Sequence, residues 1–268
     1  MIPDNAVEIS KGLFAVGPSL FLKSHSALIF GDVHVGYEEM LNREGFLIPR
    51  FHIREVLKII NPIVESLSPE MIVINGDLKH EFGTIYDQEW RDTLKLIDFL
   101  SEKVSRKSLS GKTGLVLVRG NHDTILGPIA AKRNIRVVDS LVIGRNLILH
   151  GHKLPDELGE DSSEFASSEF RNCDRIIISH EHPSVTLSKG SRREKFKCFL
   201  KCSFRNKELI VLPSLNPLVE GSDVTLERPM SPFIDSYDPC QLWVLSDKNE
   251  ILPFGTVSSL LEELKRLS

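Results

Sequence analysis

The stretch LVLVRGNHD, residues 115–123, decides the fold of this chain. Its first four residues form an apolar run without alternation, which is typical of a strand that is buried on both faces. An amide, an imidazole and a carboxylate follow at Asn121, His122 and Asp123, directly after a glycine. Ligands of open α/β sheets bind outside the carboxyl ends of the strands. The stretch therefore predicts a buried strand of an α/β sheet that ends in a functional site.

Four other apolar runs end in the same way. They are ALIF before Gly31-Asp32-Val33-His34, IVIN before Gly76-Asp77, LIL before His150-Gly151-His152 and IIIS before His180-Glu181-His182. Seven of the nine histidines lie in or just after these five strand exits. A single histidine in such a place is more often satisfied inside a core, and a single D-x-H or G-D occurs by chance. The recurrence of the pattern predicts a metal cluster at one edge of the sheet.

Strands and helices are expected to alternate in the first half of the chain. The strands are expected at 12–22, 25–30, 71–74 and 115–118, and the helices at 37–43, 51–67 and 89–104. Pro62 is expected to kink or split the helix over 51–67, because proline removes a helical hydrogen bond. The alternation predicts a mostly parallel or mixed sheet with helices on both faces.

The sequence of the second half of the chain predicts a second sheet, antiparallel, that begins at residue 136. Further elements are expected at 136–138, 141–143 and 146–149 (strands), 163–171 (helix), 175–179, 185–187, 196–204, 208–212 and 241–246 (strands) and 256–267 (helix). Residues 213–239 contain many prolines and predict a long surface loop that could carry specificity. We expect a single domain over 1–268, with the metal motifs in 32–182 and the C-terminal strands, long loop and helix in 183–268.

The composition excludes several classes of protein. The 268 residues carry a formal net charge of −4, unlike a strongly basic nucleic-acid-binding domain. No apolar stretch approaches the length of a membrane span, and the N-terminus has no basic region followed by an apolar core. The four cysteines form no C-x-x-C pair, so neither a zinc ribbon nor a disulfide framework is expected. We therefore expect a cytoplasmic protein with no membrane partner and with reduced, structural thiols.

Two clusters of basic residues have two interpretations each. The larger cluster contains Lys189, Arg192, Arg193, Lys195, Phe196, Lys197, Phe199 and Lys201. It could be a track for a phosphate backbone with stacking rings, or an amphipathic hairpin that turns Phe196, Cys198 and Leu200 inward and Lys195, Lys197 and Lys201 into water. We favour the hairpin. A second basic cluster lies just downstream of the Asp32-Val33-His34 motif and consists of Arg43, Arg50, His52 and Arg54. It could form a basic rim of the site that contacts phosphates, or a solvent-exposed face without such a role.

The ordered motifs D-x-H, G-D, G-N-H-D, H-G and H-x-H resemble those of the calcineurin-like metallophosphoesterase superfamily. The resemblance spans Asp32 to His182, and the ordered combination is far more specific than any one of its pieces. It implies a four-layered α/β/β/α sandwich with mixed sheets and a site for two divalent metal ions. Ser179 stands where many members have glycine, a small-for-small change that should leave the ligands in place.

The resemblance also implies a set of metal ligands, taken position by position. The first ion would be held by Asp32, His34 and His182, the second by Asn121, His150 and His180, and Asp77 would bridge the two. Carboxylate, amide and imidazole ligands without thiolate favour manganese, iron or zinc over magnesium alone. Manganese is our first choice, on ligand type and on the family resemblance.

Three further residues match positions next to the ligands. His122 would act as a general acid or contact a phosphoryl oxygen, and Asp123 would orient it. The segment Gly76-Asp77-Leu78-Lys79-His80 lacks the acidic-Arg-Gly continuation of the serine/threonine phosphatases. It resembles instead the SbcD-type nuclease subunits of DNA break repair, in which the equivalent of His80 lies near the substrate. The compact SbcD-related phosphoesterases of archaea, and the bacterial phosphoesterases associated with a DNA ligase and helicase, are the most similar branches.

The resulting expectation is a two-metal-dependent phosphodiesterase, a nuclease that acts on DNA or RNA by attack of a metal-bound hydroxide on phosphorus. One alternative is a hydrolase of small phosphodiesters or nucleotides, for which an acidic surface would suffice. Another is a non-catalytic scaffold with the same fold, which we discount because every ligand position is occupied. The expected partners are a nucleic acid or a small phosphodiester; a homodimer and a DNA-repair protein partner stay open.

Overall fold

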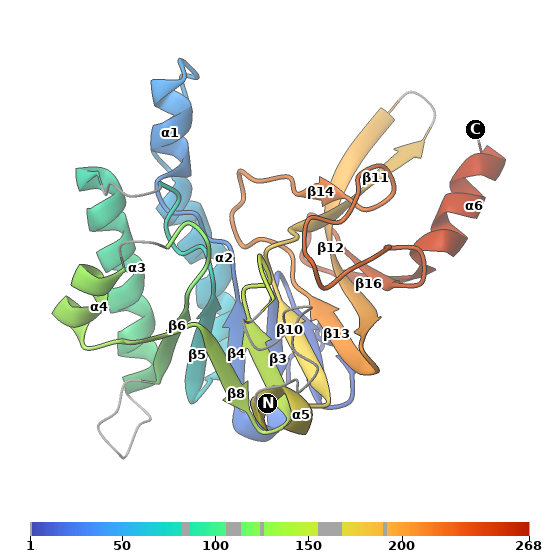
Figure 1. Ribbon diagram of the computed structural model, residues 1–268. Coiled ribbons are helices and arrows are strands. Elements are labelled where there is room, and N and C mark those ends of the chain that lie inside the picture. Colours follow the sequence, from blue (N-terminus) through green and yellow to red (C-terminus); the bar gives the residue numbers. More distant parts are fainter. Residues whose placement is uncertain are drawn as a thin grey trace.

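The computed structural model describes residues 2–81, 86–105, 114–123, 126–154, 168–189 and 192–267. Two β-sheets lie face to face in its centre, and helices flank them on the outside (Figure 1). Within these residues no helix is both long enough and apolar enough to cross a membrane.

The first sheet carries the N-terminal half of the site. Its strand order follows the sequence: β1 (Val7–Ser10), β2 (Leu13–Val16), β3 (Ser19–Leu22), β4 (Ala27–Phe30), β5 (Met71–Asn75), β6 (Leu115–Val118) and β7 (Arg136–Val138), with the 3₁₀ turn η1 (Lys23–His25) before β4. Strands β1 to β4 pair antiparallel, whereas β4 to β7 pair parallel. Parallel strands end at the same edge, so the exits of β4, β5 and β6 lie next to one another.

Three helices pack on the outer face of the first sheet, and a further helix, α1 (Tyr37–Arg43), follows the exit of β4. The three are α2 (His52–Leu67), α3 (Asp87–Ser105) and α4 (Gly127–Arg133). Helix α2 turns Val56, Ile60 and Val64 toward this sheet, as the helical spacing of these residues predicts. The helix continues through Pro62, so the expected split does not occur. Pro62 is exposed, and water can therefore satisfy the carbonyl group that it leaves without a helical partner.

The second sheet carries the rest of the site. Its strands are β8 (Ser140–Ile143), β9 (Asn146–Leu149), β10 (Arg175–Ile178), β11 (Pro183–Lys189), β12 (Arg192–Phe204), β13 (Lys207–Val211), β14 (Ser222–Asp223), β15 (Gln241–Leu245) and β16 (Ile251–Thr256), and its order is β14-β11-β12-β13-β10-β9-β8, with β15 on β12 and β16 on β15. Strand β10 runs parallel to both β9 and β13. The exits of β9 and β10 therefore lie at one edge.

Apolar side chains join the layers. Ile29 and Val73 from the first sheet meet Ile148, Ile177 and Phe199 from the second, and all five are fully buried. Apolar residues of α5 (Ser168–Asn172) and α6 (Val257–Leu267) belong to a further core cluster with the second sheet. Helix, sheet, sheet and helix thus form the four layers of the expected α/β/β/α sandwich with mixed sheets, and this fold class is confirmed.

The second sheet begins later than predicted. Strand β7 belongs to the first sheet and pairs parallel with β6, so the expectation of a new antiparallel sheet from residue 136 is wrong. The chain crosses between the sheets at Asp139, and only β8 and β9 form the expected antiparallel pair. The apolar sequence of residues 136–138 did not reveal which sheet this strand joins, because a short buried strand has the same sequence pattern in either sheet. Helix α4 and strands β1, β14 and β16 were not predicted, and the single strand expected at 12–22 is two antiparallel strands, β2 and β3. Of the helix expected at 163–171, residues 163–167 lie outside the described residues.

The expectation of four reduced thiols is also wrong. Cys202 and Cys240 form a disulfide with a Sγ–Sγ distance of 2.09 Å. Strand β12 pairs with β15 so that Lys201 lies opposite Gln241, which brings the two neighbouring cysteines together. Their separation of 38 residues hides this from any spacing rule. Cys173 and Cys198 are buried free thiols.

Replacement of Phe199 by alanine should lower the free energy of unfolding by about 3–5 kcal/mol, because its ring fills the space between the sheets. Phe46, which follows α1 and is 57% exposed, provides the matched control, and Phe46→Ala should change stability by less than about 0.5 kcal/mol. Urea unfolding followed by circular dichroism measures both variants. Equal losses would contradict the packing of the two sheets.

Candidate metal centre

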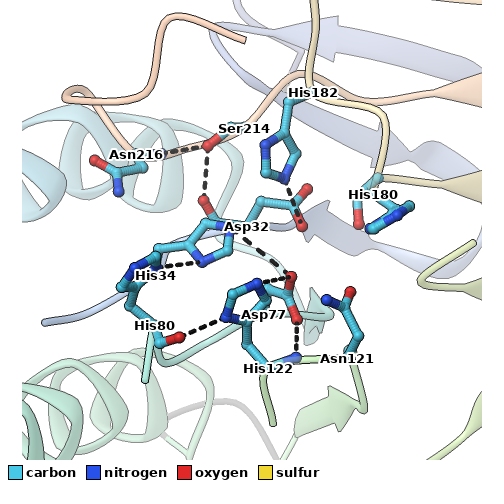
Figure 2. A network of polar contacts seen from close by, with 12 residues as sticks. Asp32, His34, Asp77, His80, Asn121, His122, His180, His182, Ser214 and Asn216 are labelled. Atoms are coloured by element: carbon cyan, nitrogen blue, oxygen red, sulfur yellow. Dashed lines mark hydrogen bonds and ion pairs between the residues drawn. The ribbon is translucent and has the colours of Figure 1, made fainter. Parts of the chain in front are cut away.

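The backbone turns sharply at three of the strand exits, those of β4, β5 and β10. Asp32, His34, Asp77 and His182 have φ values of 55°, 47°, 44° and 45°. Non-glycine residues seldom adopt this left-handed region, and residues held there by their surroundings cluster at functional sites. The turns aim side chains from both sheets into one space, where the imidazoles and carboxylates face each other (Figure 2).

One group of potential ligands consists of Asp32, His34 and His182, whose ligand atoms lie within 4.8 Å of one another. Asp32 is fully buried, and His182 Nε2 lies 3.2 Å from Asp32 Oδ1. The approach is not a hydrogen bond, since both Asp32 carboxylate oxygens and His182 Nε2 have no hydrogen-bond partner. A buried carboxylate without a partner is costly. The donor set therefore fits a cation.

A second group consists of Asp77, His150 and His180, again within 4.8 Å. His150 Nε2 lies 3.3 Å from Asp77 Oδ2 and 3.1 Å from His180 Nδ1. Asn121 adds its Oδ1 atom at 2.9 Å from the same His150 nitrogen. Asp77 also reaches the first group, because its Oδ2 atom lies 3.8 Å from His34 Nε2. Its carboxylate thus lies between the two groups.

The electrostatics leave several ring nitrogens available. Burial, together with the neighbouring His182, lowers the pKa of His34 well below its usual value. Burial lowers the pKa of His180 to about 4. Burial alone would raise the pKa of Asp77, but hydrogen bonding and charge from His150 outweigh it and hold that pKa below its usual value. At neutral pH His34 and His180 are therefore neutral and Asp77 is ionised, the states in which these groups bind metals. Burial alone would lower the pKa of His150, but the hydrogen bond to Asp77 and the charge of Asp32 outweigh it and raise that pKa, so a metal ion would have to displace the proton of this ring.

His122 and His80 lie on the open side of Asp77. The backbone N–H of His122 donates to Asp77 Oδ1 at 2.9 Å. The Nδ1–H group of the His122 ring donates to the carbonyl of His80. That bond fixes the tautomer and leaves Nε2 directed toward Asp77 Oδ2, at 4.0 Å. The rings of His80 and His122 stack with centroids 5.3 Å apart. His80 Nδ1 lies 3.4 Å from His34 Nδ1, so His80 is adjacent to the first group.

Asp123 positions loops. Its buried carboxylate accepts hydrogen bonds from the backbone N–H groups of Gly120, Leu78 and Lys79, at 3.0, 3.3 and 3.3 Å. It thereby ties the exit of β6 to the exit of β5. Burial, together with the charge of Asp77, raises the pKa of Asp123 to about 6. The orientation of the His122 ring comes from the carbonyl of His80.

A brace behind Asp32 was missed by the sequence reasoning. Ser214 Oγ donates to the carbonyl of Asp32 at 2.8 Å, and the backbone N–H of Asn216 donates to the same oxygen at 3.3 Å (Figure 2). Lys197 Nζ in turn donates to the carbonyls of Ser214, at 2.8 Å, and of Asn216. Burial lowers the pKa of Lys197 to about 7. The expectation that Lys197 lies in water is therefore wrong.

The structure also excludes the surface alternative for two residues of the basic clusters. Phe199 is fully buried and cannot stack on a nucleobase, because the middle of β12 is covered on both faces. His52 is 1% exposed and therefore cannot belong to a surface rim. Its backbone N–H donates to Glu38 Oε2 at 2.9 Å. Arg50 instead pairs with Glu39 at the surface.

The proline-rich segment 213–239 is anchored to the site. Glu181, between His180 and His182 after the end of β10, is buried and accepts hydrogen bonds from the N–H groups of Met230 and Ser231 and from the hydroxyl of Tyr237. Phe233 and Tyr237 are buried as well, so the segment is only partly the surface loop that was expected. Its irregular sequence gave no signal for these contacts.

Two glycines permit the close approach of the exits. A Cβ atom on Gly120 would lie 2.1 Å from Asp77 Oδ1, and one on Gly76 would lie 2.1 Å from His150 Nδ1. Both distances are far below van der Waals contact. Glycine at these positions is therefore a requirement of the site.

Comparisons with known proteins find one family and several solved structures that are similar to the chain. Residues 25–192 match the sequence pattern of the calcineurin-like phosphoesterase family. Nuclease MPE of Pseudomonas putida is similar over 93% of this chain and 98% of its own, with 19% identity and a TM-score of 0.57. The E. coli phosphoesterase Yfce (86% and 98% covered, 13% identity, TM-score 0.37) and vacuolar protein sorting 29 of Cryptosporidium parvum (86% and 97% covered, 13% identity, TM-score 0.34) are more distant. No curated protein matches the chain.

Replacement of Gly120 by alanine should weaken the binding of a divalent metal ion by about 10–100-fold, because the added methyl group displaces the Asp77 carboxylate. Gly127 is the matched control, since a Cβ atom there meets nothing within 4 Å. Isothermal titration calorimetry with Mn²⁺ measures both variants, with thermal unfolding as the check of folding. An unchanged affinity in folded Gly120→Ala would contradict the placement of Asp77.

Proposed function

The chain belongs to the calcineurin-like phosphoesterase family, and we propose that this metal-dependent phosphoesterase is a phosphodiesterase that cleaves nucleic acid. The observation that carries the proposal is the pair of ligand groups joined at Asp77, one of them containing a buried carboxylate without a hydrogen-bond partner. The nuclease assignment is supported by the Gly-Asp-Leu-x-His segment at 76–80, which resembles the SbcD-related branch. The Pseudomonas putida protein that shares the fold over 93% of the chain is a nuclease.

The proposed ligands are those that the two groups bring together. Asp32, His34 and His182 would hold one divalent ion, Asn121, His150 and His180 the other, and Asp77 both. Oxygen and imidazole donors without thiolate favour manganese over magnesium, with iron or zinc as alternatives. When bound, two such ions supply an activated water and neutralise charge on the phosphoryl oxygens.

The side chains of this chain supply the remaining chemistry. The His122 ring donates its Nδ1–H to the His80 carbonyl, which leaves Nε2 as the nitrogen that faces the reacting group. In the imidazolium form, with a proton on each nitrogen, Nε2–H would donate a proton to the leaving oxygen. The half-exposed His80 ring stacks on His122 and forms the wall on the substrate side. Asp123 keeps the exits of β5 and β6 at a fixed separation, which holds His122 in register with Asp77.

A hydrolase of small phosphodiesters is the second candidate. The net charge of −4 favours it, because a strongly basic field is absent. The two candidates differ in what they turn over: the small-substrate enzyme would hydrolyse an aryl phosphodiester and leave DNA and RNA intact.

We expect the pure protein to degrade end-labelled single-stranded DNA or RNA with Mn²⁺. The variant Asp77→Ala should lower the rate by more than about a hundredfold, because it removes the carboxylate between the two ligand groups. Asp247→Ala removes an exposed carboxylate in the turn between β15 and β16 and should retain the wild-type rate.

An aryl phosphodiester, assayed beside the nucleic acids, separates the candidates. Hydrolysis of the aryl diester alone would overturn the nuclease proposal in favour of the second candidate. Nucleic-acid cleavage that persists in Asp77→Ala would show that the activity arises elsewhere.

A further inference from the structure

A pocket of about 470 Å³ opens beside the first ligand group. His182 forms one part of its wall, Tyr37 at the start of α1 another, and Lys195 on β12 a third, with residues 218–222 completing it. Its volume falls in the range of about 300–1,000 Å³ that is typical of ligand pockets. The pocket is thus large enough for one nucleotide, and it borders a metal ligand directly.

The pocket beside the second ligand group is less suited to a nucleotide. It borders His150 and has a volume of about 140 Å³. Its Arg119 is already paired with Asp139 at 2.6 Å. A larger pocket of about 650 Å³ near Lys201 and Lys207 includes none of the proposed metal ligands. Among these pockets, the one beside His182 combines sufficient space with contact to the site.

Lys195 gives this pocket a cation that can meet a phosphate. Its side chain is 24% exposed, and its ion pair with Glu227 is long, at 4.0 Å. An ion pair at that distance near the surface contributes little, so a phosphate group can compete for the ammonium group. Lys197, two residues along β12, is instead engaged with the carbonyls of Ser214 and Asn216. The basic run of β12 therefore divides into a structural lysine and one that faces the pocket.

Tyr37 gives the same pocket an aromatic wall. Its ring packs edge-on against His80 with centroids 4.9 Å apart, which fixes its position beside the site. Nucleobases stack on such rings with little dependence on sequence. Glu220 is the acid of the pocket, and it is exposed.

Resting on the nucleic-acid substrate proposed above, we propose that this pocket holds the nucleotide that adjoins the scissile phosphodiester on the His182 side. Lys195 contacts the next phosphate of the chain, and the Tyr37 ring contacts the base. A small diester has no second phosphate for Lys195 to contact, although an aromatic ester group can still stack on the Tyr37 ring. The pocket is therefore what separates polynucleotides from small phosphodiesters as substrates.

The test compares one enzyme on two substrates, a single-stranded oligonucleotide and bis(p-nitrophenyl) phosphate, with Mn²⁺. Lys195→Ala should lower kcat/KM for the oligonucleotide about tenfold more than for the aryl diester, mainly through KM. It should also reduce the salt dependence of log kcat/KM by about 0.7, the value for one phosphate contact to a single strand. Lys248→Ala removes the same charge from an exposed turn and should change neither value.

Two further variants test the base contact and the sign of the charge effect. Tyr37→Leu should raise KM for the oligonucleotide about tenfold, whereas Tyr37→Phe, which keeps the ring, should stay near wild type. Glu220→Gln should lower KM for the oligonucleotide, opposite to Lys195→Ala, because it removes an anion from the same pocket.

Each remaining outcome overturns the proposal in a recognisable way. Equal losses on both substrates in Lys195→Ala would show that Lys195 acts through the metal centre or the fold. A loss no larger than that of Lys248→Ala would place the adjoining nucleotide elsewhere. If the wild-type enzyme hydrolyses the aryl diester but no oligonucleotide, the nuclease proposal itself fails and this inference fails with it.

Discussion

The buried carboxylate of Asp32 is the constraint on which the site depends. Both of its oxygens lack a hydrogen-bond partner, although the side chain is fully buried at the junction of the two sheets. Such a group is expensive unless a cation or donor satisfies it. The surrounding chain keeps Asp32 in this position. Ser214 and Asn216 donate hydrogen bonds to the Asp32 carbonyl and so stabilise its left-handed backbone conformation, and Lys197 donates to the carbonyls of both residues. The protein therefore keeps a costly group in place where a metal ion would compensate it.

The two sheets contribute different donors, so the centre forms only when they pack. The first sheet supplies Asp32, His34, Asp77 and Asn121, and the second supplies His150, His180 and His182. The apolar residues between the sheets, such as Ile29 and Ile177, thus hold the two halves of the site at a fixed distance. Gly76 and Gly120 remove the side-chain atoms that would keep the halves apart. The geometry of the site therefore depends on the same packing between the sheets that stabilises the core.

The strand exits made most of the site predictable from the sequence. Apolar runs that end in metal-binding residues place those residues at a sheet edge, and the structure brings together the residues that were proposed as ligands. What escaped prediction depends on partners distant in sequence. Lys197 looks like a solvent-facing strand residue until the turn at 214–216 covers it, and the Cys202–Cys240 pair appears only once β12 and β15 are in register. Glu181 gave no signal because its donors lie in an irregular segment. Strand β7 was assigned to the wrong sheet because the hydrophobic pattern of a short strand does not determine which strand it pairs with.

The most direct test of this account is the stoichiometry of Mn²⁺ binding, measured by isothermal titration calorimetry on metal-free protein and on Asp32→Asn. The account predicts two ions for the wild type and one for Asp32→Asn, because the substitution removes the charge of the first ligand group and leaves Asp77, His150 and His180 unchanged. Unfolding curves of the two proteins establish that both are folded. Two ions bound with wild-type affinity by Asp32→Asn, or none bound by the wild type, would contradict the claim that the buried carboxylate is held for a metal ion.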